Sequence, residues 1–235
     1  MHMNTKAFRV RALRWWRKEI RPLLILVLIL FSIRSSLADW NDVPSGSMRP
    51  TILEGDRIFV NKLAYDLKVP FTTWHIAEWG GPSRGDVVVC FSPADESRLV
   101  KRVVGVPGDV IELRDNQLWV NGQAVEYGRL DKETINQIDA AGRDQFVFAT
   151  EKLGERDHPL MLSPRTPAIR SFGPTEIPEG HYFMMGDNRD DSKDSRWFGL
   201  VERDRIVGRA FRIAFSLDYE NYYLPRWDRM LRSLP

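Results

Sequence analysis

Hydrophobic and polar positions divide the chain into an apolar run near its start and a long β-type region after it. The run, PLLILVLILFSI, covers residues 22–33 and contains no charge. From Asp39 onward, short segments rich in Val, Ile and aromatic residues are separated by turn sequences such as EGD, RGD, PGD and NG. These segments are RIFVNKLAY (57–65), DVVVCF (86–91), LVKRVVGV (99–106), DVIEL (109–113) and QLWVNGQAV (117–125). Short strands without a helical stripe between them predict a mainly β, antiparallel-sheet domain and not a doubly wound one.

The second half of the chain is less regular. Residues 123–175 are more polar, with LDKETINQIDAAGRDQ and LSPRTP, and we expect a β and loop excursion there. A second β region follows at GHYFMMGDN (180–188) and DRIVGRAFRIAFSL (204–217). The tail from residue 221 to 235 is expected to be a docked or frayed end.

The apolar run has two interpretations. Seven Lys or Arg residues and a single acid, Glu19, precede residue 22. A basic segment before a short apolar run describes a secretory signal peptide, and SLA at 36–38 supplies a small-x-small cleavage pattern. The alternative is an anchor helix over 20–38, whose nineteen residues would extend about 28 Å, close to the thickness of a bilayer core.

We favour the anchor, because Arg21 and Arg34 would lie near the helix ends and Trp15, Trp16 and Trp40 would flank it. The expected organisation is a basic cytoplasmic N-terminus (1–19), a transmembrane helix (20–38) and an extracytoplasmic domain (39–235). The positive-inside rule places the basic end in the cytoplasm. SLA also raises self-cleavage as a hypothesis, which N-terminal sequencing would test.

Composition narrows the function classes. The 235 residues are 43% hydrophobic, enough for a packed core, and the net charge of +2 gives no argument for a nucleic-acid partner. Cys90 is the only cysteine, so an internal disulfide is excluded. The four histidines are far apart in the sequence, and no metal site is indicated.

The stretch PSGSMRPT (44–51) contains a candidate nucleophile, Ser47, without a nearby histidine. Gly46 permits unusual backbone conformations, and such a loop can expose a hydroxyl and direct N–H groups at a substrate carbonyl. A connecting loop without chemistry is the alternative. A serine needs a base, and lysine can serve if burial lowers its pKa from about 10.4 by roughly 3–5 units.

Lys101 in RLVKRVVGVPGD is such a lysine, since in a strand it would share a face with Leu99 and Val103. Its neighbour Arg102 would point to the opposite face. The alternative is an edge-strand lysine that opposes aggregation. A third stretch, GDNRDDSKDSR (186–196), is dense in carboxylates and hydroxyls, and it could be a solvated or calcium-binding loop, although EF-hand spacing is not met.

Together these stretches resemble the bacterial type I signal peptidases, membrane-bound serine proteases with a Ser/Lys dyad. PSGSMRPT, EGDRIFVNKLAY (54–65), RGDVVVCF (84–91), VKRVVGVPGD (100–109) and GDNRDDSKDSRWFG (186–199) follow the order of the family's motifs. The resemblance covers most of residues 40–215, and the ordered set is more specific than any single motif. It implies the family's mainly antiparallel catalytic fold.

The resemblance implies roles for particular residues. Ser47 would be the nucleophile, Lys101 the general base and Ser45 an oxyanion donor beside the Ser47 N–H. The supporting residues would be Ser192, which bonds the lysine amine, Asp194 and Arg196, which form a polar network, and Asp187, which pairs with Arg102. The sequence departs from the family's pattern at Asp191, where asparagine is common, and we expect this side chain to face solvent. Many relatives carry two N-terminal membrane helices, whereas we expect one here.

The resemblance also implies an activity: cleavage of signal peptides from exported preproteins after a small-x-small (Ala-x-Ala) motif. It requires no cofactor or metal, and it implies contact with the lipid bilayer, proximity to the secretion translocon and a place in the inner membrane. Phe71, Trp74 and Trp79 would enter the interface or pack in the core. Two rival functions stay open: a related Ser/Lys peptidase that matures conjugation pilins, and a peptide-binding β domain without catalysis. A self-cleaving repressor is disfavoured, because the sequence lacks a DNA-binding helical domain and such a protein would have no use for the basic membrane segment.

Overall fold

The structure is a computed structural model that describes residues 14–36, 38–69, 72, 74–136, 145–219 and 221–235. The β-type pattern after residue 38 folds into short strands, as the sequence predicts. Their bounds are β1 (Ala38–Asp42), β2 (Asp56–Asn61), β3 (Asp66–Lys68), β4 (His75–Glu78), β5 (Val87–Phe91), β6 (Arg98–Gly105), β7 (Val110–Arg114), β8 (Gln117–Val120), β9 (Gln123–Ala124), β10 (Tyr127–Gly128), β11 (Val147–Leu153), β12 (Arg156–Leu162), β13 (Phe172–Glu176), β14 (His181–Met185), β15 (Val201–Glu202), β16 (Ile206–Asp218) and β17 (Leu224–Pro225).

Helices are few and short among the described residues. They are the π-helix η1 (Trp16–Ile20), the α-helices α2 (Arg21–Ser36), α3 (Lys132–Asn136) and α4 (Ser195–Phe198), and the 3-10 turns η2 (Gly46–Met48), η3 (Lys62–Ala64), η5 (Arg203–Arg205) and η6 (Trp227–Arg229). Of these, η2 and α4 belong to the two polar stretches that the sequence analysis singled out.

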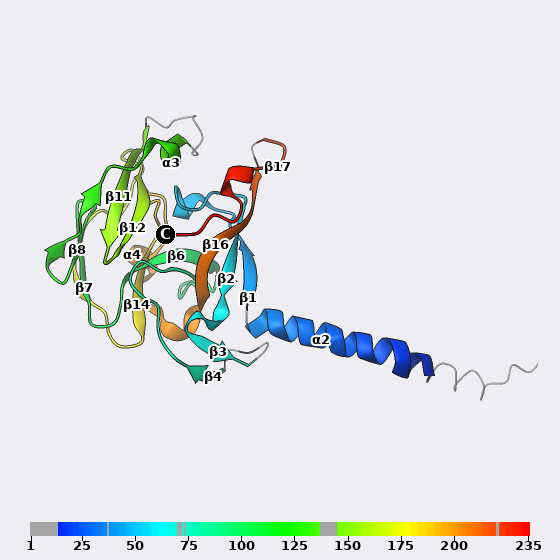
Figure 1. The fold of residues 1–235 in the computed structure, drawn as a ribbon. Helices are drawn as coiled ribbons and strands as arrows, with labels where there is room; N and C mark the ends of the chain where they lie inside the picture. The colour runs from blue at the N-terminus through cyan, green and yellow to red at the C-terminus, as the bar shows by residue number, and fades with distance from the viewer. Residues whose placement is uncertain (1–13, 37, 70–71, 73, 137–144, 220) are drawn as a thin grey trace, which may run out of the picture.

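One large sheet organises the molecule. Its strand order is β1-β2-β16-β5-β6-β14-β15, with β17 paired to β16. Smaller sheets with the orders β10-β11-β12 and β13-β7-β8-β9 lie beside it, opposite the end from which α2 projects (Figure 1). Every pairing between these strands is antiparallel, so the predicted mainly antiparallel β class is confirmed.

The large sheet is buried on both faces at its centre, which explains the uninterrupted apolar sequence of β5. Val87 and Val89 pack into one core cluster with Met48, whereas Val88 and Cys90 pack into a second cluster on the other face. A third cluster joins β6 and β14 to the β7–β8 sheet. Strand β6 therefore touches all three hydrophobic regions, and its position is determined from both sides.

The apolar run near the start forms α2, which projects from the body of the protein (Figure 1). Its side chains from Leu23 to Phe31 are exposed. No helix in the described part of the chain is both long and apolar enough for a membrane crossing. The predicted transmembrane helix over 20–38 is therefore not found: α2 has 16 residues, which extend about 24 Å, and the turn before it carries charges.

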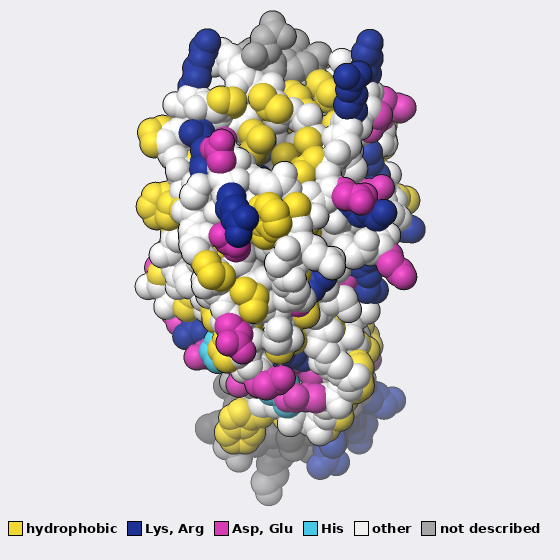
Figure 2. Space-filling view, turned by 90° about the vertical axis from the view of Figure 1, so that its left-hand side faces the viewer, with side chains coloured by type: hydrophobic (Ala, Val, Ile, Leu, Met, Phe, Trp, Pro, Cys, Tyr) yellow, Lys and Arg dark blue, Asp and Glu magenta, His cyan; other side chains and the backbone are white. Residues whose placement is uncertain are grey.

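The segment 123–175 contains the hairpin β11–β12, whose strands pair from Val147–Leu162 to Leu153–Arg156. The face of the molecule around β7 and β8 shows small groups of hydrophobic side chains among acidic and basic side chains (Figure 2).

The tail after β17 is docked on β16. Leu231 N–H donates to Ile213 O, and Ile213 N–H donates to Arg232 O. Leu234 packs on the core cluster that contains Met48.

Candidate active site

Ser47 lies in the 3-10 turn η2, which three residues connect to the end of β1. The next residue, Met48, is fully buried in the core of the large sheet, which fixes the turn to the body of the protein. Ser47 itself is half-buried. The loop therefore presents its hydroxyl at the surface while its neighbour anchors it, which the spacing of the sequence alone could not show.

Lys101 reaches this hydroxyl from β6. Its Nζ lies 2.6 Å from Ser47 Oγ, and the lysine is only 2% exposed. As the strand alternation predicts, Lys101 shares a face with Leu99 and Val103, which pack in the cluster around Val88 and Cys90. The dyad residues proposed from sequence are thus in direct hydrogen-bond contact, although 54 positions separate them.

Burial lowers the pKa of Lys101 below the ordinary lysine value of 10.5. The negative charge of Asp194 opposes this shift most, followed by Cys90 and Asp187. Desolvation dominates because the ammonium form loses its hydration in the apolar site. The environment therefore favours the neutral amine that a general base requires.

A cavity of about 320 Å³ adjoins the pair. Its walls are Asn41–Ser45, Ser47 and Met48 on one side and Arg98–Lys101 on the other. Strand β14 pairs with β6 only from Arg102 onward, so the cavity lies where that edge of β6 is not paired by β14. An extended chain can be accommodated between these two walls.

Ser45, the predicted oxyanion donor, is exposed, and its Oγ lies 3.5 Å from Ser47 Oγ. This separation is at the outer limit of a hydrogen bond. It brings the second hydroxyl to the same side of the loop as the first, within reach of an atom bound between them.

The polar stretch 186–196 lies beside the dyad. Asp194 caps α4 and accepts hydrogen bonds from the backbone N–H of Gly186 at 3.0 Å and from Arg196 Nε at 2.8 Å. These contacts outweigh burial and lower the pKa of Asp194, which keeps it ionised.

Ser192 is buried against Gly186 and contributes to the low pKa of Asp194, but its Oγ makes no direct hydrogen bond to Lys101 among the described residues. Asp191 faces solvent, as expected.

Arg102 and Asp187 form the predicted pair. Arg102 Nε and Nη2 each lie 2.8 Å from one Asp187 oxygen, and both side chains are 1% exposed. Arg102 Nη1 also donates to the carbonyls of Gly85 and Pro235. Arg102 therefore has its partners on its own face of β6, whereas Lys101 contacts Ser47 on the other face.

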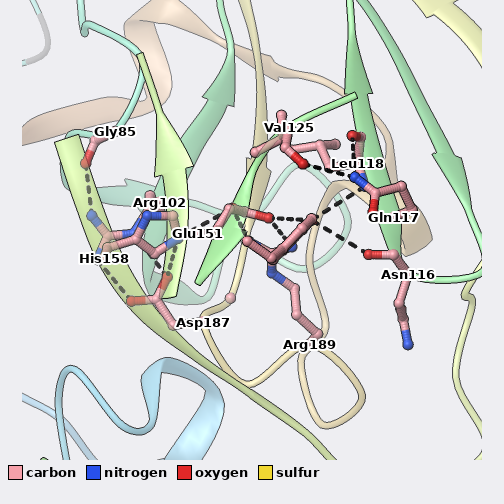
Figure 3. Close-up of polar contacts among 12 residues, drawn as sticks. Gly85, Arg102, Asn116, Gln117, Leu118, Val125, Glu151, His158, Asp187 and Arg189 are labelled. Atoms are coloured by element: carbon pink, nitrogen blue, oxygen red, sulfur yellow. Dashed lines mark hydrogen bonds and ion pairs between the residues drawn. The ribbon is translucent and has the colours of Figure 1, made fainter. Parts of the chain in front are cut away.

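Three buried residues that the sequence analysis missed extend this network (Figure 3). His158 Nε2 lies 3.2 Å from Glu151 and 3.8 Å from Asp187, and Glu151 pairs with Arg189. Burial and then the charge of Arg102 lower the pKa of His158, so it is favoured as neutral. Glu151 and His158 belong to the β11–β12 hairpin, in a segment without recognisable motifs, so no sequence signal pointed to them.

Two further missed residues, Thr51 and Asn188, lie inside the motifs that were recognised. Thr51 donates a hydrogen bond from its hydroxyl to Asp187, and Asn188 contacts the Ser47 loop through both backbone and side chain.

Of the aromatic residues expected at the membrane interface or in the core, Phe71 lies outside the described residues, whereas Trp74 and Trp79 are exposed and not part of a core. Among the residues that the structure describes, no group of His, Cys, Asp or Glu is arranged to hold a metal ion.

Comparison with known proteins identifies the family of the chain. The family described as "Signal peptidase, peptidase S26" matches residues 16–215. Signal peptidase I of Pseudomonas fluorescens is 38% identical over 91% of this chain and 76% of its own length, and that of Pseudomonas aeruginosa is 37% identical over the same shares.

More distant relatives have similar coverage. Signal peptidase I T of Bacillus subtilis is 35% identical over 86% of each chain. A crystal structure of a signal peptidase I from Enterococcus faecalis, 30% identical, overlaps 55% of this chain and 95% of that chain with a TM-score of 0.33, which carries no argument about the fold.

Proposed function

The chain belongs to the signal peptidase family, peptidase S26, and from this premise we propose that Ser47 and Lys101 form the catalytic dyad of a signal peptidase I. Membership of the family makes the protein a serine endopeptidase that acts on the signal peptides of preproteins. The observation that carries the assignment of the dyad is the contact of 2.6 Å between a buried lysine amine and the serine hydroxyl.

In the first step Ser47 Oγ attacks the carbonyl carbon of the scissile peptide bond. Neutral Lys101 Nζ accepts the hydroxyl proton as the new C–O bond forms. The carbonyl oxygen becomes an oxyanion, and we assign as its donors the Ser47 backbone N–H and the Ser45 hydroxyl, whose Oγ lies 3.5 Å from Ser47 Oγ. Removing one such donor in other enzymes raises the barrier by about 3–4 kcal/mol.

Collapse of this intermediate breaks the C–N bond, and the Lys101 ammonium returns its proton to the leaving amine. The signal peptide is then an ester on Ser47. Water enters, loses a proton to Lys101 and attacks the ester carbonyl. The C–O bond to Ser47 then breaks, the Lys101 ammonium returns the proton to Ser47 Oγ, and the acid leaves as the carboxylate after losing its proton to solvent. Asp194, Arg196 and the Arg102–Asp187 pair take no part in proton transfer, and they hold the two strands and loops that carry the dyad.

The cavity beside the dyad supports the proposed small-x-small pattern of the substrate. A preprotein segment in extended form adds to the edge of β6 at residues 98–101. Alternate side chains of an extended chain point to the same side. The first and third residues before the cleaved bond therefore enter the cavity while the second points away, which is the pattern small-x-small.

We place residues 39–235 outside the cytoplasm as the peptidase domain, attached to the membrane through α2. The helix exposes its apolar side chains from Leu23 to Phe31, and lipid is the partner that such side chains favour. Exposed Trp40, Trp74 and Trp79 lie in β1 and around β4, and their amphipathic rings suit the headgroup region. A preprotein leaving the translocon would meet the site at that surface.

The test is cleavage of a purified preprotein with an Ala-x-Ala site in detergent, followed across pH. The wild type, Ser47→Ala, Lys101→Ala and the control Lys152→Ala, which changes an exposed lysine, are compared. Both dyad variants should lose activity, and the control should retain it. The wild-type rate should rise with an apparent pKa below that of free lysine.

Continued cleavage by Ser47→Ala and Lys101→Ala would contradict the dyad. A folded wild type that is inactive on preproteins would instead favour the more specialised maturation peptidase. A non-catalytic peptide-binding domain predicts that Ser47→Ala leaves function intact.

A further inference from the structure

Asn188 forms hydrogen bonds with the backbone carbonyls of Gly46 and Ser47. Its side-chain Nδ2 donates to Gly46 O at 3.1 Å, and its backbone N–H donates to Ser47 O, also at 3.1 Å. It therefore contacts the carbonyl on each side of the nucleophile. Asn188 is 3% exposed, so these contacts form in a site shielded from water.

The orientation of the Asn188 amide follows from its partner. A carbonyl oxygen only accepts hydrogen bonds, so the NH₂ group and not the amide oxygen must face Gly46. The amide oxygen of Asn188 is buried and has no hydrogen-bond partner among the described residues. The side chain thus makes its one hydrogen bond to the loop of the nucleophile.

The carbonyl that Asn188 holds is part of the peptide group that supplies the Ser47 N–H. In a trans peptide the C=O and N–H point in opposite directions. Holding Gly46 O with Asn188 Nδ2, together with the 3.0 Å bond from Arg49 N–H, therefore fixes the direction of the Ser47 N–H. A hydrogen bond accepted by the carbonyl also polarises the N–H of the same group.

Asn188 is itself held rigidly. The adjoining backbone pairs with β12, since Met161 N–H donates to Asp187 O and Arg189 N–H donates to Met161 O, both at 2.9 Å. The side chains of its neighbours, Asp187 and Arg189, are each buried in an ion pair. Asn188 therefore links β12 to the loop that carries Ser47, so the position of the loop depends on that of β12.

We propose that Asn188 is a positioning residue for the oxyanion site: it orients the Ser47 N–H toward the developing negative charge. This inference rests on the proposed function and adds a residue that does not touch the substrate. Because the oxyanion forms only after attack, Asn188 stabilises the transition state and leaves binding of the uncleaved preprotein unchanged.

The experiment compares the wild type, Asn188→Ala, Asn188→Asp and the control Gln117→Ala. Gln117 is a suitable control because its side-chain amide also donates to a backbone carbonyl, that of Val125 at 2.8 Å, in the small sheet. Each protein is assayed with the Ala-x-Ala preprotein for kcat and KM. Its affinity is also measured for a peptide aldehyde with the same sequence before the cleavage point, which adds to the serine hydroxyl and forms a tetrahedral adduct.

We expect kcat of Asn188→Ala to fall about tenfold to a hundredfold, less than the roughly hundredfold to thousandfold loss from deleting an oxyanion donor outright. KM should stay within about twofold, and affinity for the aldehyde should fall by the same factor as kcat/KM. Asn188→Asp should be slower still, since a carboxylate oxygen would face Gly46 O. Gln117→Ala should match the wild type in all three measurements.

Three results would overturn the inference. They are a rise in KM with kcat unchanged, an unchanged affinity for the aldehyde, and an Asn188→Ala enzyme as fast as the wild type. Thermal unfolding of each variant separates loss of fold from loss of positioning, and Asn188→Asp, which preserves shape, carries the test if Asn188→Ala does not fold. An inactive wild type would overturn the proposed function itself, which distinguishes the two failures.

Discussion

Replacing Arg102 by methionine tests how the buried ion pair supports the site. Methionine fills a similar length without charge, and it leaves Asp187, 1% exposed, without the two 2.8 Å bonds from the guanidinium. Removing one partner of a buried pair costs about 3–5 kcal/mol, because the remaining charge is uncompensated. For a protein of this size, that corresponds to a fall in Tm of about 6–20 °C.

The double variant Arg102→Met with Asp187→Leu should be less destabilised than the sum of the single variants, since neither position of the pair then holds an unpaired buried charge. The pH dependence has a defined sign. Burial raises the pKa of Asp187, but Arg102, followed by His158 and Thr51, more than offsets burial, so the pKa is lowered in the folded protein. The stabilisation is therefore present above the ordinary carboxyl range and is lost as pH falls through the lowered pKa.

The assay is thermal and urea unfolding of the variants between about pH 3 and 8, the interval that includes the ordinary carboxyl pKa. Arg57→Met, which breaks an exposed contact with Asp42 at 3.6 Å, is the matched control and should unfold almost as the wild type does. A loss below about 1 kcal/mol for Arg102→Met would place the pair among weak surface ion pairs and refute the reasoning. Strict additivity in the double variant would refute it as well.

Two further predictions concern the dyad and its loop. Asp194→Asn removes the negative charge that most opposes the lowered pKa of Lys101, so the rising limb of the kcat/KM profile should move to lower pH, and an unmoved or alkaline-shifted limb would contradict this. Gly186→Ala should reduce kcat by about tenfold or more, because the added Cβ would overlap Ser47 O. Gly173→Ala, where a Cβ meets nothing within 4 Å, should leave kcat unchanged in the same assay.

The strands could be predicted because their signals are local, whereas Ser47 and Lys101 were assigned as a dyad through the resemblance to a family. Runs such as DVVVCF and LVKRVVGV carry β-type residues between turn sequences, and strands form there as β5 and β6. The alternation along β6 predicts opposite faces for Lys101 and Arg102, and the structure places them so. The helix near the start was predicted over 20–38, whereas α2 covers Arg21–Ser36 and follows the π-helix η1, because apolar composition alone does not show where a helix begins and ends.

Glu151 and His158 could not be predicted, because each looks like an ordinary polar residue of a segment without recognisable motifs. Their importance comes from the pairing of β11 with β12, which sets Glu151 opposite His158 and brings both to Arg189 and Asp187. Ser192 shows the opposite case: the resemblance predicts a bond to the lysine, and the structure places its hydroxyl beside Asp194 and Gly186 instead.

The amino-acid sequence by itself determined the antiparallel β class, the turns and the apolar surroundings of Lys101, because side-chain period and turn chemistry act over a few residues. Only the tertiary structure decided which segments meet. The contact of Ser47 with Lys101 and that of Asn188 with Gly46 span 54 and 142 positions, and both depend on how the sheet orders its strands. Burial then depends on those contacts, and burial is what turns an ordinary lysine and an ordinary asparagine into parts of the proposed site.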